Sequence, residues 1–459
     1  MVLQSAAMKN QKHNMEMKIT ASTLLLLVGG MLVHVLPTIC TAAGGFSLPL
    51  VVNHGGGRYR VDADGFMVVN ATSFHHRPPL TPPLEYTYGV AVAIGTGRGK
   101  STYFLVLDTA SSLPWMRCAH CLPVQRQRSP VFDPSDSSSY RPLHPTSPLC
   151  RAPNPVLPAG DKCSFHLPGE AHGYVGTDTI ILGNPTLPIH SVAFGCAQST
   201  EGFDTKGTFA GTLGMGRLPT SLIMQIKDRV GSRFSYCLIG LGHSPGRNGF
   251  IRFGADIPDP TLLVHHRIKI LPTPPHLPHG VADSAYYVKL LGISLNGTPI
   301  PGIRQAMFER RSDGSGGCFV DAGTQVTHLV PAAYAVVEEA VAHMVQQWGY
   351  KRVRDPNFSL CFREHPGIWS HIPKLTLDFE GPASRTVAHL EIVSRNLFLK
   401  VDNQPLVCFG VYRTSRGSPT VVGAMQQVDT RFIFDLHANT ITFHRESCEA
   451  DTVATPSEW

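Results

Sequence analysis

The sequence predicts an all-β protein built from two similar halves, with only a few short helices. Three observations support this: short alternating apolar runs dominate the chain, 43 glycines and 37 prolines supply many turns, and each half contains an apolar run that ends in aspartate. A typical domain has about 150 residues, so a chain of 459 residues is expected to form more than one unit. An apolar fraction of 42% is enough for a sizeable core.

The N-terminal segment, residues 1–43, has the pattern of a secretory signal peptide. Lys9, Lys12 and Lys18 precede an apolar run over 19–39, and small residues follow it. A transmembrane anchor is the alternative, but glycines, a histidine and a proline interrupt the run. We therefore expect a protein without a stable membrane anchor, secreted to the extracellular space (the apoplast) or delivered to the vacuole.

The cysteines and the charge fit a secreted protein. Of eleven cysteines, Cys40 lies in the expected signal, and the even number that remains favours disulfides. Cys118 and Cys121 have the spacing of half a zinc site, but no second half completes it, so we expect no metal and no cofactor. A net charge of +6 without a basic run gives no case for nucleic-acid binding. Three Asn-x-Ser/Thr sequons are candidate glycosylation sites: Asn70, Asn296 and Asn357.

Residues 44–84 are polar, rich in proline and weakly periodic, which is typical of a propeptide or linker. A strand is expected from Glu85, followed by a turn over 95–100 and a second strand over 101–107. The turn resembles a phosphate-binding loop, but Ile94 stands where that motif requires glycine, so nucleotide binding is rejected.

The rest of the chain divides into two lobes. A Pro- and His-rich stretch over 256–283 marks the boundary, giving an N-terminal lobe at 85–270 and a C-terminal lobe at 271–459. The clearest helix is expected over 331–348, and a shorter one near Ser221. Further strands are expected at Tyr286–Ile293, Lys374–Phe379 and Arg431–Phe434.

Each lobe carries one aspartate at the end of an apolar strand. Asp108 ends the run that begins at Phe104, and Asp321 ends the run that begins at Cys318. Small and hydroxyl-bearing residues follow both aspartates, as a tight turn aimed at a carboxylate requires. Two such phrases in a duplicated chain would bring the two carboxylates together across a pseudo-twofold axis.

These phrases and their surroundings resemble the pepsin-like aspartic proteases, in particular the nepenthesin-like plant group. The resemblance covers roughly residues 85–448. Besides the aspartate phrases it rests on the following segments: Trp115 before Cys118, Phe194-Gly195-Cys196, Gly214-Met215-Gly216-Arg217, Phe234-Ser235-Tyr236-Cys237, Leu360-Cys361-Phe362 and Val422-Gly423-Ala424-Met425-Gln426-Gln427.

The resemblance implies a bilobal pepsin-like acid protease fold, in which a six-stranded sheet links the lobes. It implies a zymogen that matures to a monomer and binds a protein or peptide substrate in an interlobe cleft. Asp108 and Asp321 would be the catalytic pair, and Thr109, Ser111, Gly323 and Thr324 would support their loops. The implied disulfides are Cys237 with Cys448 and Cys361 with Cys408, and Cys150 with Cys163 is a further pair.

The chemistry of such a pair follows from charge proximity. Two neighbouring carboxyls retain one proton over an acidic range. The ionised carboxylate would take a proton from a water that attacks the peptide carbonyl, while the protonated carboxyl polarises that carbonyl. From the sequence, either aspartate can be the one that starts protonated. The 22 histidines would add positive charge in an acidic compartment.

Three departures from the family pattern bear on activity. Ala110 stands in place of glycine, and Ala322 removes a hydroxyl that would brace the two loops. The flap segment over 163–173 is short and offers no tyrosine at the expected place, which would leave Trp115 without its partner. The alternative function is therefore a weak or inactive pepsin-fold protein that binds a protein partner or acts as an inhibitor. A serine hydrolase is disfavoured because the one Gly-x-Ser-x-Gly match, Gly242-His243-Ser244-Pro245-Gly246, is not followed by the helical pattern of a nucleophile elbow.

Overall fold

The computed structural model describes residues 44–54, 59–61, 66–70, 86–124, 127, 129–151, 156–182, 187–203, 207–240, 249–258, 266–274, 277 and 283–450. The expected signal peptide and part of the expected propeptide lie outside these residues. Among the described helices, none combines the length and apolar character needed to cross a bilayer.

The first half of the chain is a set of antiparallel and parallel strands, as the alternating pattern predicts. The expected strand pair is present, because β4 and β5 pair antiparallel from Gly89 opposite Val106 to Ile94 opposite Ser101. The strands of this half are β4 (Tyr86–Ile94), β5 (Ser101–Asp108), β6 (Trp115–Leu122), β7 (Arg141–Pro142), β8 (Val156–Ala159), β9 (Lys162–Leu167), β10 (Ala171–Leu182), β11 (Leu187–Thr200), β12 (Gly211–Gly214), β13 (Arg233–Cys237) and β14 (Phe250–Gly254). The short helix α1 (Leu222–Ile226) begins after Ser221, whose hydroxyl accepts a hydrogen bond from Met224 N–H.

The second half has the same all-β character and contains the longest described helix, α2 (Pro331–Gln346). This helix begins at the predicted residue and buries Val337, Val341 and Val345, which recur at helical spacing. The other helices are α3 (Ser394–Leu397) and α4 (Ala424–Gln427). The strands are β15 (Arg267–Lys269), β16 (Tyr287–Val288), β17 (Leu290–Leu295), β18 (Thr298–Pro299), β19 (Cys318–Val320), β20 (His328–Leu329), β21 (Arg352–Val353), β22 (Cys361–Arg363), β23 (Leu375–Glu380), β24 (Val387–Ile392), β25 (Phe398–Asp402), β26 (Leu406–Phe409), β27 (Tyr412–Arg413), β28 (Thr420–Val422), β29 (Thr430–Asp435) and β30 (Thr440–Arg445).

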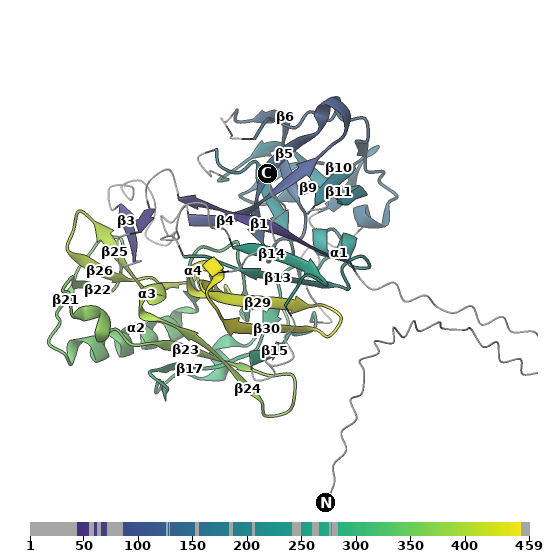
Figure 1. Cartoon of the computed structure of the whole chain (residues 1–459). Helices are drawn as coiled ribbons and strands as arrows, with labels where there is room; N and C mark the ends of the chain where they lie inside the picture. Colours follow the sequence, from purple (N-terminus) through teal and green to yellow (C-terminus); the bar gives the residue numbers. More distant parts are fainter. Residues whose placement is uncertain are drawn as a thin grey trace, which may run out of the picture. The chain divides into compact units, whose positions relative to one another are not determined.

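One sheet joins strands from both halves of the chain. This sheet has 15 strands, and one end of it runs β15-β30-β29-β13-β14 and then β1 (Gly45–His54), which leads on to β4 (Figure 1). Strands β13 and β29 pair antiparallel from Arg233 opposite Asp435 to Cys237 opposite Arg431. The rings of Phe234 and Phe434 stack across this junction with centroids 4.5 Å apart, and both are buried. The junction therefore holds the two halves together through backbone hydrogen bonds and a shared apolar layer.

The segment 44–70, which the sequence marks as propeptide or linker, contributes three strands. They are β1 (Gly45–His54), β2 (Tyr59–Val61) and β3 (Met67–Asn70). Strand β1 pairs with β14 through its first half and with β4 through its second half, and β3 pairs parallel with β25. Phe46, Leu48 and Leu50 are buried on alternate positions of β1, so the period-2 signal for a strand was present in this segment.

Four disulfides cross-link the described part of the chain. They join Cys118 with Cys196, Cys150 with Cys163, Cys237 with Cys448, and Cys361 with Cys408. The Cys118–Cys196 bond links β6 to β11 and was not among the predicted pairs. Cys121 and Cys318 are buried and carry free thiols.

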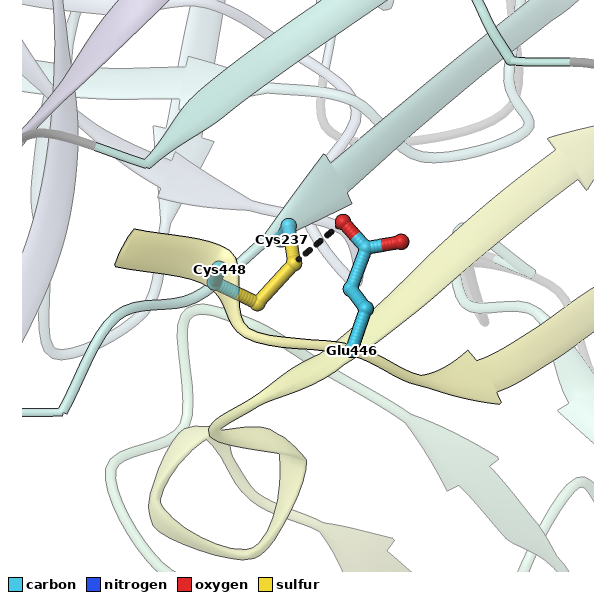
Figure 2. Close-up of side chains that lie close together, drawn as sticks. All are labelled: Cys237, Glu446 and Cys448. Atoms are coloured by element: carbon cyan, nitrogen blue, oxygen red, sulfur yellow. Dashed lines mark hydrogen bonds between the residues drawn. A yellow bond between two sulfur atoms is a disulfide. The ribbon is translucent and has the colours of Figure 1, made fainter. Parts of the chain in front are cut away.

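The C-terminal disulfide lies beside an acidic side chain. Glu446 Oε1 is 3.2 Å from Cys237 Sγ, and Figure 2 shows this carboxylate beside the Cys237–Cys448 bond. The two sulfur atoms are bonded to each other, so they carry no proton to donate and offer no thiolates to a metal. The cluster is therefore a cross-link with a neighbouring carboxylate rather than a metal site.

Candidate active site

Asp108 is positioned by a strand that threads past its loop. It is the last residue of β5, and β12 runs parallel beside β5 so that Gly214 lies opposite Asp108. Met215 N–H donates to Asp108 O at 2.8 Å. A methyl group on Gly214 would lie 2.7 Å from the backbone of Ser112, so the threading requires glycine here.

Asp321 has the equivalent arrangement in the second half. It follows β19, which pairs parallel with β28, and its own N–H donates to Val422 O at 3.0 Å. Gly423 is the threading residue, because a methyl group there would lie 2.2 Å from the backbone of Val326. Both halves thus present an aspartate from a strand end, with a parallel strand beside it that leads into a glycine, Gly214 or Gly423.

The two aspartate loops contact each other through Thr109. Its hydroxyl accepts a hydrogen bond from Ala322 N–H at 3.1 Å and lies 3.4 Å from Val320 O, to which it can donate. The same hydroxyl lies 3.1 Å from Asp321 Oδ1, which also accepts from Thr109 N–H at 3.2 Å. A buried threonine in the first loop therefore fixes the position of the second aspartate.

The donors around the two carboxyls differ. Asp108 Oδ1 accepts from the backbone N–H groups of Ala110 at 2.8 Å and Ser111 at 2.7 Å. Asp321 accepts from Gly323 N–H at 2.9 Å and from the Thr324 hydroxyl at 2.7 Å, in addition to Thr109. Asp321 therefore accepts more hydrogen bonds from its surroundings than Asp108 does.

The pKa of Asp108 is raised well above its ordinary value. Burial is the largest cause, the negative charge of Asp321 is the next, and the charge of Glu170 adds to both. The hydrogen bonds from Ser111 and Ala110 oppose the shift without cancelling it. The charge of Asp321 therefore influences the titration of Asp108, as expected for neighbouring carboxyls.

The residues after the aspartates pack closely. A methyl group on Gly323 would lie 2.7 Å from Asp108 Cγ, so the second loop covers one side of the first carboxyl. Ala110 occupies the equivalent place in the first loop and does not have a positive φ, so its methyl group causes no backbone strain. Ala110 O accepts a hydrogen bond from the Ser284 hydroxyl.

Two polar residues that the sequence did not single out as site residues support the second loop. The side-chain amide of Gln427 donates to Asp321 O at 2.9 Å and to Val422 O at 2.7 Å. Its carbonyl oxygen accepts from Tyr236 OH at 2.6 Å, and both side chains are buried. The Gln426-Gln427 pair, which follows Gly423 after two apolar residues, was the sequence signal for this support.

The hairpin formed by β9 and β10 is the segment predicted to be a short flap. Its strands pair from Leu167 opposite Ala171 to Ser164 opposite Tyr174. The same part of β10 also pairs with β11, from Ala171 opposite Thr200 to Tyr174 opposite Cys196. The hairpin is therefore held in the sheet up to its turn and does not extend beyond its neighbour.

Trp115 has a partner, contrary to the expectation from the missing tyrosine. Its indole Nε1–H donates to Glu170 Oε1 at 3.1 Å, and Thr212 Oγ1 donates to the same oxygen at 3.0 Å. Glu170 is the last residue of the hairpin turn. The expected partner was a tyrosine hydroxyl, but a carboxylate oxygen also accepts a hydrogen bond from the indole N–H, and Glu170 takes that place.

Comparisons with known proteins agree with this geometry. The family described as xylanase inhibitor N-terminal matches residues 88–255, and the one described as xylanase inhibitor C-terminal matches 285–445. Aspartic proteinase PCS1 of Arabidopsis thaliana is 30% identical over 409 residues, which cover 82% of this chain and 86% of that protein. The chain belongs to the pepsin-like aspartic protease family.

A second curated relative and two solved structures are also similar to this pepsin-like chain. Aspartic proteinase nepenthesin-1 of Nepenthes gracilis is 29% identical over 376 residues, covering 79% of this chain and 78% of that protein. Basic 7S globulin from soybean has a TM-score of 0.61 at 16% identity, covering 88% of this chain and 97% of that one. Conglutin gamma from lupine seeds has a TM-score of 0.60 at 17% identity, with coverage of 89% and 96%. At these identities the two seed-protein structures support the fold.

Two of the three sequon asparagines of this pepsin-like chain have side chains that reach solvent. Asn296 is exposed in the turn between β17 and β18, and Asn357 is partly exposed. The backbone of Asn70 lies at the end of β3.

Proposed function

We propose that this pepsin-like protein is an aspartic endopeptidase that hydrolyses peptide bonds with a water activated by Asp108 and Asp321. The observation that carries the proposal is the hydrogen-bonded contact between the two aspartate loops. The hydroxyl and the backbone N–H of Thr109 in the first loop lie 3.1 and 3.2 Å from Asp321 Oδ1 in the second. The charge of Asp321 also raises the pKa of Asp108. Together, the contact and this effect support two carboxyls that lie close enough to share one proton.

The unequal donors favour one division of roles. Asp108, with the raised pKa, keeps the shared proton and polarises the peptide carbonyl as the general acid. Asp321, with more donors, is the ionised general base that takes a proton from the lytic water. The water oxygen then bonds to the carbonyl carbon, and the carbon–nitrogen bond breaks as the leaving amine is protonated.

Hydrolysis of casein or a peptide across pH 3 to 7 tests the proposal. The fully processed protein is expected to cleave in the acidic part of this range and to be inhibited by pepstatin. Asp108→Asn and Asp321→Asn are each expected to lower kcat by at least about a thousandfold, because each removes a group that takes part in proton transfer. Asp161→Asn, at an exposed turn of the hairpin between β8 and β9, is the matched control and should retain activity. Activity that survives Asp108→Asn would contradict the two-aspartate mechanism.

A second candidate function is a catalytically weak pepsin-fold protein that binds a protein partner or acts as an inhibitor. Two observations favour it: Ala322 supplies no hydroxyl to the loop of Asp108, and the flap hairpin pairs with β11 up to its turn. The xylanase inhibitor descriptions of both matched families point the same way. Absence of cleavage at every pH in processed protein, together with tight binding of a protein partner, would favour this candidate.

We also propose that the chain is made as a zymogen, enters the secretory pathway and is glycosylated. The four disulfides support folding in an oxidising compartment. Signal cleavage near residue 43 and propeptide cleavage near residue 84 are checked by N-terminal sequencing of secreted protein. Glycosylation at Asn296 and Asn357 is checked by peptide mass spectrometry before and after enzymatic deglycosylation. We expect the mature protein to be a monomer, which gel filtration tests.

A further inference from the structure

Glu170 is held firmly at the turn between β9 and β10. Its backbone N–H donates to Leu167 O at 3.0 Å, and its carbonyl oxygen accepts from Glu201 N–H at 2.8 Å. The hairpin is also paired to β11 on its other side. The side chain therefore projects from a fixed backbone rather than from a free loop.

The carboxyl of Glu170 reaches the strand layer that carries the first aspartate. Its Oε1 accepts from Thr212 Oγ1, and Thr212 lies on β12 opposite Val106 of β5. Asp108 follows Val106 by two positions on that strand, and the charges of Glu170 and Asp108 influence each other. Glu170 is therefore a third carboxyl beside the two aspartates.

Among the described residues, the hydrogen bonds to this carboxyl all go to one of its two oxygens. Trp115 and Thr212 both donate to Oε1, whereas in the described part of the chain no donor is bonded to Oε2. Within the same residues, no lysine, arginine or histidine forms an ion pair with Glu170, Asp108 or Asp321. Burial raises the pKa of Glu170, the hydrogen bonds from Thr212 and Trp115 oppose this rise, and the charge of Asp321 adds a smaller rise. Glu170 is partly exposed, so Oε2 is an acceptor without a donor among the described residues at a position that solvent reaches in part.

We propose that Glu170 is a specificity-determining residue that selects peptides with a lysine or arginine side chain next to the scissile bond. The inference rests on the proposed function in one respect, namely that a peptide lies across Asp108 and Asp321. Its cationic side chain would then reach Glu170 Oε2 while Oε1 keeps its bonds to Trp115 and Thr212. A charge-assisted hydrogen bond in a partly desolvated site is stronger than one between neutral groups.

Binding of uncleavable peptides tests the inference without requiring catalysis. Two peptides with a reduced-amide bond at the scissile position are compared by calorimetry at pH 7, one with lysine before that bond and one with norleucine. Processed wild-type protein is expected to bind the lysine peptide about tenfold more tightly. Glu170→Gln keeps an oxygen acceptor for Trp115 and Thr212 but removes the charge, so this ratio should fall to about one.

Glu201→Gln is the matched control. It removes the same charge from an exposed residue whose backbone is bonded to Glu170, and the lysine preference should remain. Equal binding of the two peptides by wild-type protein would overturn the inference, and so would an unchanged ratio in Glu170→Gln. Cleavage of the corresponding ordinary peptides is measured separately. Lysine-selective binding without cleavage would support the inference and contradict the endopeptidase proposal, whereas cleavage without lysine preference would do the reverse.

Discussion

The hydroxyl of Thr109 accepts a hydrogen bond of 3.1 Å from the backbone N–H of Ala322. The reverse hydrogen bond, from Thr109 N–H to a side-chain hydroxyl at position 322, cannot form because Ala322 has only a methyl group. Thr109 N–H donates to Asp321 Oδ1 instead. The junction between the two aspartate loops is therefore braced by one side chain rather than two. This asymmetry decides how several substitutions are expected to behave.

Restoring the missing hydroxyl should stabilise the junction. Ala322 is buried beside Thr109, so the hydroxyl of Ala322→Ser would lie where Thr109 N–H can donate to it. We expect the free energy of unfolding to rise by at most about 1 kcal/mol, because Thr109 N–H already donates to Asp321 Oδ1 and would be shared with the new hydroxyl, and we expect kcat to rise with it. Chemical denaturation and peptide hydrolysis measure the two effects. Thr109→Val is the opposite test and should lower stability by about 1–3 kcal/mol, since it leaves Ala322 N–H unpaired.

A single methyl group at Gly323 should displace Asp108. Gly323→Ala would place a carbon 2.7 Å from Asp108 Cγ, which is closer than carbon atoms approach without a shift of the structure. We expect a loss of about 1–3 kcal/mol in stability and a large fall in kcat. Gly292→Ala is the control, because the nearest atom to its added methyl is Asp378 Oδ2 at 3.7 Å. Comparable losses in both variants would show that the effect is not specific to Asp108.

The raised pKa of Asp108 should make the protein less stable as pH rises. The folded protein holds this proton more tightly than the unfolded chain, so the benefit is present below about pH 4 and is lost as pH rises through the folded pKa. Asp108→Asn cannot ionise. We therefore expect it to exceed wild type in stability by about 1 kcal/mol or more at pH 8, with the difference vanishing near pH 4. Urea denaturation at several pH values measures this difference, and a constant difference across the range would contradict the assignment.

Glu446 should have the opposite pH dependence. Burial alone would raise the pKa of this carboxyl, but hydrogen bonds from His444 and Arg431 lower it to about 2. Its contribution is therefore present above pH 4.5 and is lost as pH falls toward 2. We expect Glu446→Gln to cost about 1–3 kcal/mol at pH 6 and progressively less below pH 4.5. Glu391→Gln removes an exposed partner of Lys374 and should change stability by less than about 1 kcal/mol.

The segment 44–70 should remain bound after a cut near residue 84. Strand β1 is paired with β14 and β4, and its Leu50 is completely buried. The ring of Phe66 stacks on that of Trp369 with centroids 3.8 Å apart. A protein cut at an engineered protease site near residue 84 should give two bands on a denaturing gel and one peak in gel filtration. Leu50→Asp places a charge in this buried position and should release the segment. Separation of the two pieces from the cut wild-type protein would disprove strand retention.

Local patterns in the sequence were sufficient for the main elements and for the two aspartates. Alternation predicted β4, β5 and β29, helical spacing predicted α2, and the duplicated phrases singled out Asp108 and Asp321. The Cys118–Cys196 disulfide and the contacts of Gln427 with Asp321 and Tyr236 were not predicted, because no sequence motif pairs these residues and only the packing of the strands brings them together. Glu170 was missed for a chemical reason, since the usual residue in contact with this tryptophan is an aromatic hydroxyl rather than an acid.

The sequence by itself determined that this protein is an all-β chain of two related halves, each with one aspartate at a strand end. Periodicity and turn residues act over a few positions, so they are readable without a structure. Only the tertiary structure decided that Thr109 alone braces the two loops and that the flap hairpin is paired with β11. It also decided that the Glu170 carboxyl lies between Trp115 and Thr212. These contacts join residues tens to hundreds of positions apart, and their distances depend on how whole strands pack, which no local pattern encodes.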